Sequence, residues 1–166
     1  MIDLNRVKIA LFDFDDTLCI HQKADNFVAE YYNFAMVKGR VSYWDEMNSQ
    51  PNKQMRVFMD KLSVNNVELG LISATSFMQT AVNKIEWVKL KYGRTLKNYC
   101  TGDFDSKVQI IKALITANNL SPDEVLFVDD LYSNIDAVAK LGVQVATPME
   151  VVNYINNLMR VSPRVE

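Results

Sequence analysis

One stretch of the sequence decides the fold: Lys8-Ile9-Ala10-Leu11-Phe12-Asp13-Phe14-Asp15-Asp16-Thr17-Leu18. Its apolar residues run into three carboxylates within four positions, and a threonine follows. A short apolar run without alternation predicts a strand that is covered on both faces, as in a parallel sheet. Because side chains two positions apart in an extended chain point to the same side, Asp13 and Asp15 are expected to face one spot where the strand ends.

Two carboxylates so close together repel each other. At an effective dielectric constant of about 20, unit charges a few ångströms apart repel by roughly 4 kcal/mol. A hard divalent cation with oxygen ligands would offset this cost, so Asp13 and Asp15 are candidate metal-site residues. A polar turn with solvated carboxylates is the alternative that this stretch alone leaves open.

Composition indicates an ordinary soluble domain. The chain has 166 residues, of which 49% are hydrophobic and 23% charged, and this length fits one domain with a small insertion. The net charge of −2 and the scattered basic residues do not favour nucleic acid or an anionic membrane as a partner. Two cysteines, the lack of a signal-peptide pattern and the lack of a membrane-length apolar run predict a cytoplasmic protein.

Strand and helix patterns alternate from residue 66 onwards, which predicts a doubly wound, Rossmann-like parallel sheet between two layers of helices. Before that, residues 19–50 form a block that is too long for a plain connection and too short for its own core, with helical spacing over residues 25–38. We therefore expect a single domain over residues 1–166 with an insertion at about 19–50. The later strands are expected at 67–72, 96–101, 125–128 and 143–146. The helices are expected at 55–62, from about 76 to 91, at 106–118, at 132–141 and from 147 to about 159.

Polar residues collect where the apolar strands end. Ser73 follows the run at 67–72, and Asp129 and Asp130 follow Val125-Leu126-Phe127-Val128. In open parallel sheets, ligands bind at this carboxyl edge, so these residues are expected near Asp13 and Asp15. Successive residues of a strand point to opposite sides, and we expect Asp130 to ligate a cation directly and Asp129 to lie behind it.

Two weaker signals concern anion binding. Ser73 and Ala74 precede an expected helix, and a hydroxyl with backbone N–H groups at a helix N-terminus can bind an anion. Taken alone, Ser73 and Thr75 are better explained by ordinary helix capping, which needs no ligand. Lys107 lies in the first turn of a later helix, where the helix dipole disfavours a cation. A solvated surface lysine is the alternative for Lys107. His21, the single histidine, is expected to tune or pack rather than to catalyse.

These motifs, in this order, resemble those of the haloacid dehalogenase-like (HAD) hydrolase superfamily. The resemblance covers an apolar strand followed by Asp13-Phe14-Asp15-Asp16-Thr17-Leu18, a strand ending in Leu71-Ile72-Ser73, the lysine Lys107, and a strand ending in Val128-Asp129-Asp130. It spans residues 8 to about 147. Asp16 stands where many members have glycine.

The resemblance implies a Mg²⁺-dependent phosphoryl-transfer site that acts on a small phosphorylated substrate. Asp13 would be the nucleophile that forms an aspartyl-phosphate, and Asp15 the general acid and base. Ser73, Ala74 and Lys107 would bind the phosphoryl oxygens, and Thr17 would brace the loop. The implied Mg²⁺ ligands are Asp13, the backbone carbonyl of Asp15, and Asp130 or Asp129. The block at 19–50 occupies the place of a cap, and it is small for this family.

Three functions fit this set of residues. The first is a phosphatase that hydrolyses a phosphate monoester, and the second is a phosphomutase or phosphotransferase that uses the same aspartyl-phosphate. The third is a non-catalytic phosphate-binding module, which has no need of Asp15 as an acid and base. A carboxylate nucleophile divides a very slow displacement into two easier steps, so the sequence favours an enzyme.

Overall fold

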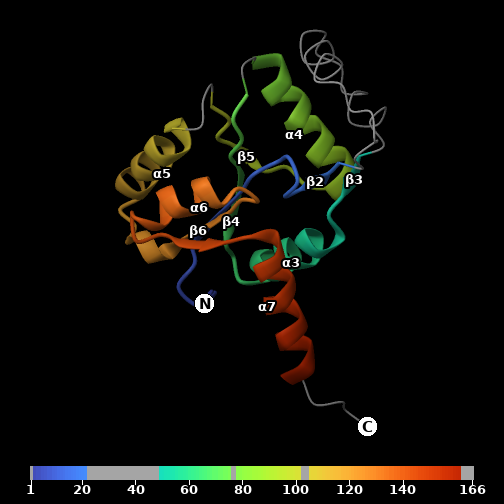
Figure 1. Cartoon of the computed structure of the whole chain (residues 1–166), viewed down its shortest axis with the longest axis vertical. Helices are drawn as coiled ribbons and strands as arrows, with labels where there is room; N and C mark the ends of the chain where they lie inside the picture. The colour runs from blue at the N-terminus through green and yellow to red at the C-terminus, as the bar shows by residue number, and fades with distance from the viewer. Residues whose placement is uncertain (1, 22–48, 76–77, 102–104, 162–166) are drawn as a thin grey trace.

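The central sheet of the computed structural model has five parallel strands in the order β5-β4-β1-β6-β7 (Figure 1). The structure describes residues 2–21, 49–75, 78–101 and 105–161. The strands are β1 (Ile9–Phe12), β4 (Glu68–Leu71), β5 (Lys97–Asn98), β6 (Val125–Val128) and β7 (Gln144–Ala146). All four residues of β1 and of β6 are buried, because helices cover both faces of the sheet.

Two apolar clusters, one on each face of the sheet, attach the helices. The helices are α3 (Lys53–Val64), α4 (Met78–Tyr92), α5 (Asp105–Ala117), the 3-10 helix η1 (Pro122–Glu124), α6 (Tyr132–Ala139) and α7 (Pro148–Val161). Phe58 of α3, Trp87 of α4 and Ile155 of α7 belong to one cluster, whereas Ile111 of α5 and Val138 of α6 belong to the other. Figure 1 shows α5 and α6 together, and α3 beside α7. The predicted doubly wound α/β fold is confirmed.

A second, small sheet connects the first strand to α3. It pairs β2 (Cys19–Ile20) with β3 (Gln50–Pro51) in antiparallel orientation. These two strands lie at the boundaries of the insertion expected at about 19–50. The expected cap lies largely outside the described residues, as does the helix expected over 25–38. The paired strands show that the chain leaves and returns to the domain at neighbouring points.

The register of the sheet aligns the strands that precede the polar residues. Phe12, the last residue of β1, lies opposite Leu71 at the end of β4 and Val128 at the end of β6. Asp13 and Asp129 therefore follow at the same edge, and Ser73 comes two residues after Leu71. This alignment brings together residues that lie far apart in the sequence.

The sequence predicts a helix after Ser73-Ala74-Thr75-Ser76, and the described part of α4 starts at Met78. Ala74 does not belong to this helix. Ala74 instead forms a parallel bridge with Thr101, and the Thr75 N–H donates to the Thr101 carbonyl at 2.6 Å. The chain thus continues alongside Thr101 beyond the end of β4.

Within the described ranges, no helix combines the length and the apolar character needed to cross a lipid bilayer.

Candidate active site

A buried lysine joins two of the predicted acids. Lys107, in the first turn of α5, donates from Nζ to Asp13 Oδ1 at 2.8 Å and to Asp129 Oδ2 at 2.7 Å. The lysine side chain is 2% exposed, and those of Asp13 and Asp129 are 9% and 0% exposed. Charged groups are almost never fully buried unless they are paired. The three side chains therefore form a buried ionic cluster, and Lys107 is not a solvated surface lysine.

Asp129 and Asp130 differ in their surroundings. Asp129 Oδ1 accepts hydrogen bonds from the Leu131 N–H at 2.9 Å and from Asn134 Nδ2 at 3.0 Å, in addition to the contact of Oδ2 with Lys107. Asp130 is half-buried, and the chain bends at this residue. Burial and the charge of Asp129 raise the pKa of Asp130. The bend lets both acids approach the same side, which a straight strand would not allow.

Three of the predicted acids lie close enough to hold a metal ion. One carboxylate oxygen from each of Asp13, Asp129 and Asp130 lies within 4.8 Å of the other two. Oxygen ligands of this kind suit a hard divalent cation. The hydrogen bonds at both oxygens of Asp129 leave Asp13 and Asp130 as the better donors, which fits the prediction that Asp130 binds directly.

The charges around Asp13 act in opposite directions. Burial raises the pKa of Asp13, Lys107 opposes this, and the charges of Asp129 and Asp15 raise it further, to about 6. Burial lowers the pKa of Lys107, but the charges of Asp13 and Asp129 outweigh it and the net pKa is raised. A cation beside Asp13 would favour its ionised form in the same way as Lys107 does.

A second buried lysine, which the sequence analysis missed, contacts Asp15. Lys84 of α4 donates from Nζ to Asp15 Oδ2 at 2.6 Å and to Ser73 Oγ at 2.8 Å. Its side chain is 1% exposed, and that of Asp15 is 33% exposed. Lys84 therefore links the predicted acid and base to the predicted phosphoryl-binding hydroxyl.

His21 contacts the other oxygen of Asp15. Its Nε2 donates to Asp15 Oδ1 at 2.9 Å, and its Nδ1 shares a hydrogen bond of 3.1 Å with Ser49 Oγ. Burial alone would raise the pKa of Asp15, but the charge of Lys84 and hydrogen bonds from His21 and Lys84 lower it to about 2. A neighbouring carboxylate alone would raise this pKa. At Asp15 the contacts with Lys84 and His21 act in the opposite direction and prevail.

Two residues shape the loop after β1. Asp16 has a φ of 51°, in the left-handed region that favours glycine, which explains why glycine suits this position and why aspartate is tolerated. Thr17 is fully buried, and its carbonyl accepts a hydrogen bond from Asn52 Nδ2 at 3.1 Å. Its hydroxyl has no hydrogen-bond partner among the described residues. The observed bracing contact thus runs through the Thr17 backbone.

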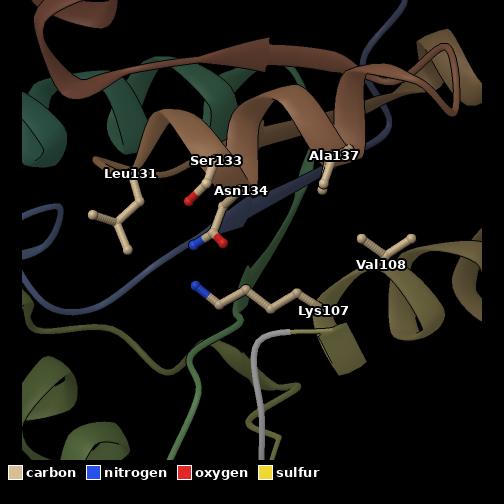
Figure 2. Close-up of a pocket in the computed structure, with 7 residues that line it drawn as sticks. Lys107, Val108, Leu131, Ser133, Asn134 and Ala137 are labelled. Carbon is tan, nitrogen blue, oxygen red and sulfur yellow. The ribbon is translucent and has the colours of Figure 1, made fainter.

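A cavity of about 340 Å³ borders this group of residues between α5 and α6. Figure 2 shows the Lys107 ammonium pointing from α5 toward Asn134 on α6, with Leu131 and Ala137 farther along the wall. Polar and apolar side chains both line the space. The cavity therefore opens beside the Lys107 end of the site and not beside Lys84.

The position of Lys84 in its helix is the signal by which it could have been found. It lies three residues after Ala81 and three before Trp87, and both of these are buried in the apolar core. A lysine on the core-facing side of an amphipathic helix must have a partner inside the protein. The sequence pattern alone does not identify Asp15 as that partner.

Comparison with known proteins establishes the fold. No protein-family model matches the chain, and no curated protein matches its sequence. A structure from Porphyromonas gingivalis, described as a predicted HAD-like family hydrolase, is 17% identical with a TM-score of 0.59, and the match covers 93% of this chain and 98% of that one.

Two longer proteins also contain the fold. The N-terminal part of a Bacteroides fragilis protein, containing a phosphatase domain complexed with Mg, is 16% identical with a TM-score of 0.57; the match covers 92% of this chain and 40% of that one. A Xanthomonas campestris protein is 20% identical with a TM-score of 0.51, and the match covers 87% of this chain and 65% of that one. This chain thus spans less than two thirds of either protein. The chain has the fold of the haloacid dehalogenase-like hydrolases.

Proposed function

We propose that the protein is a Mg²⁺-dependent phosphatase that hydrolyses a phosphate monoester through an aspartyl-phosphate on Asp13. One observation carries this proposal: Asp13 shares a buried site with Lys107, Asp129 and Asp130, while Asp15 lies beside it with a lysine of its own. A module that only binds phosphate would need cations such as Lys107 and Lys84 alone, whereas this site also contains several carboxylates. Carboxylates are useful there as a nucleophile, as an acid and base, and as metal ligands.

In the first step, an Asp13 oxygen attacks phosphorus and forms the aspartyl-phosphate while the bond to the leaving oxygen breaks. Asp15 protonates that leaving oxygen. Lys107 and Ser73 bind the phosphoryl oxygens, so that the charge of the phosphate is met by fixed donors. In the second step, water attacks phosphorus, Asp15 accepts its proton, and Asp13 is released with inorganic phosphate.

The Asp13 and Asp130 carboxylates would hold Mg²⁺, with Asp129 supporting them through its bonds to Asn134 and Lys107. When bound, Mg²⁺ supplies positive charge that lets an anionic phosphate approach the aspartates. Ionised Asp15, with its low pKa, suits the second step, in which a base is required.

We also propose that the insertion at about 19–50 acts as a small cap and that the substrate is a small phosphorylated molecule. His21 and Ser49, which lie near the two ends of this insertion, contact each other, and His21 contacts Asp15. The two ends of the insertion therefore lie at the acid and base of the proposed reaction.

The test is hydrolysis of 4-nitrophenyl phosphate with Mg²⁺ and with EDTA. We expect Mg²⁺-dependent release of phosphate by the wild type and its loss in Asp13→Asn. Asp136→Asn is the matched control, because Asp136 is exposed on α6. Acid quenching followed by mass spectrometry should find one phosphoryl group on the peptide that contains Asp13. Wild-type turnover by Asp13→Asn would remove the proposed nucleophile and with it the proposed mechanism.

A further inference from the structure

Lys84 is buried in the protein, where the loss of water around its ammonium group costs free energy. A helical lysine normally extends into water, whereas this one lies in the middle of α4 with only 1% of its side chain exposed. Removing an ammonium from water costs several kcal/mol unless its partners are well placed. The two close contacts with Asp15 and Ser73 meet this requirement.

Aromatic packing fixes the lysine further. Its Nζ lies 5.0 Å from the ring centroid of Phe14, the residue between the two leading aspartates. The Phe14 ring in turn packs edge-on against Trp87, with the ring centroids 5.3 Å apart. A cation over an aromatic face is attracted to the ring, and the rigid ring pair restricts where the ammonium can lie. The Lys84 ammonium is thus held in one position, from which it can orient the Asp15 and Ser73 side chains that it contacts.

We propose that Lys84 is a positioning residue that fixes the Asp15 carboxylate relative to the Ser73 hydroxyl and so directs the acid and base of the reaction at the phosphoryl group. This inference rests on the proposed function. Ser73 would contact a phosphoryl oxygen, and Lys84 Nζ lies 2.8 Å from the Ser73 hydroxyl oxygen and 2.6 Å from Asp15 Oδ2. The distance between the phosphoryl group and Asp15 would therefore be set through one ammonium.

The two lysines of the site have separate tasks in this arrangement. Lys107 contacts Asp13 and Asp129, the nucleophile and a member of the acid cluster, whereas Lys84 contacts the acid and base. Among the described residues, His21 contacts one oxygen of the Asp15 carboxylate and Lys84 contacts the other. Loss of Lys84 would leave the carboxylate free to rotate about its hydrogen bond to His21. Small misplacements of a reacting group are costly, because proximity and orientation supply much of the rate.

The test compares two leaving groups. Phenolate is a poorer leaving group than 4-nitrophenolate, so phenyl phosphate depends more on a correctly placed acid. We expect Lys84→Met to reduce kcat/KM for phenyl phosphate on the order of tenfold more than for 4-nitrophenyl phosphate. Asp15→Asn should show the same preference more strongly. In the double variant, Lys84→Met should add little to the preference that Asp15→Asn already produces, because both act through one group.

The matched control is Lys89→Met, the same change at an exposed position of the same helix, for which the two substrates should respond as in the wild type. Thermal unfolding monitors each variant. If Lys84→Met fails to fold, Lys84→Gln takes its place, since it keeps a hydrogen-bond donor but loses the charge and the reach of lysine.

The outcomes separate this inference from the proposed function. A wild type that hydrolyses both phosphates, combined with equal losses for both in the Lys84 variants, would overturn the positioning role and leave the phosphatase proposal standing. A wild type that hydrolyses neither would overturn both. A selective loss for phenyl phosphate that disappears in the Asp15→Asn background would support Lys84 as the residue that positions Asp15.

Discussion

The Lys107 ammonium lies 2.8 Å from Asp13 Oδ1, although 94 residues separate the two in the sequence. The same ammonium contacts Asp129, so one cation on α5 joins the ends of β1 and β6. Both acids are buried, and the low local dielectric makes each contact strong while it makes an unpaired charge costly. Lys107 therefore serves the stability of the sheet edge as well as the proposed chemistry.

Replacing Lys107 should destabilise the protein. Lys107→Met leaves two buried carboxylates without their cation, and the loss of one partner from a buried pair costs about 3 kcal/mol or more. We expect this decrease in the free energy of urea unfolding in EDTA. Lys112→Met, at an exposed position of the same helix, should stay within about 0.5 kcal/mol of the wild type. Equal stability of the two variants would show that the buried contacts contribute nothing.

Metal-free stability should depend on pH through Asp13. Its pKa is raised to about 6 in the folded protein from an ordinary value of 3.8, so the native state binds more protons than the unfolded state between these values. The free energy of unfolding should therefore fall as the pH rises from about 4 to about 6 in EDTA. The difference between the wild type and Asp13→Asn, measured by urea unfolding across this range, isolates the contribution. A pH-independent difference would contradict the raised pKa.

Replacing Asp130 should weaken Mg²⁺ binding much more than it lowers the stability of the metal-free protein. Asp130 is half-buried, whereas Asp129 is fully buried and bonded to Lys107 and Asn134. We expect Asp130→Asn to weaken Mg²⁺ binding, measured by calorimetry, at least about tenfold with little change in metal-free stability. Asp129→Asn should lower stability as well as affinity. The reverse pattern would identify Asp129 as the direct ligand.

Tyr92 should stabilise the base of the inserted segment. Its hydroxyl donates to the Leu18 carbonyl at 2.6 Å and lies 3.2 Å from the Asn52 carbonyl, so it ties the end of α4 to the chain on both sides of the β2–β3 pair. Tyr92→Phe should cost about 1 kcal/mol in urea unfolding, because the Leu18 carbonyl loses the hydroxyl and keeps only the Asn52 N–H, at 3.0 Å, as a donor. Tyr132→Phe, the same change at an exposed tyrosine, should be nearly neutral. A neutral Tyr92→Phe would show that water replaces the lost bond.

The sheet and the Asp13–Asp129 edge could be predicted from the sequence. Residues 9–12 and 125–128 are uninterrupted apolar runs that end in acids, and parallel strands place their carboxyl ends at one edge whatever the detailed packing. The pairing of the chain beyond β4 with Thr101 could not be predicted in the same way. Residues 74 and 75 pair with Thr101 through backbone bonds, which side-chain patterns do not reveal.

The partner of Lys84 and the low pKa of Asp15 were equally out of reach. Both depend on how α4 is oriented over the sheet, which is set by the packing of Trp87 on Phe14. The spacing of Asp13 and Asp15 predicts that their carboxylates lie together and repel each other. It does not show that Lys84 and His21 contact Asp15 in the folded protein. Long-range electrostatics at this site follows from the fold and not from the local pattern.

The short pair of strands β2 and β3 affects how the length and sequence of the segment between them can vary. Because Cys19–Ile20 and Gln50–Pro51 close the segment between them, its two junctions are fixed independently of its length or composition. Lengthening a closed loop costs little, about 0.6 kcal/mol for each doubling. A longer or differently composed segment could therefore be exchanged at this hairpin without disturbing the parallel sheet, so that selectivity can diverge while the reaction chemistry stays the same.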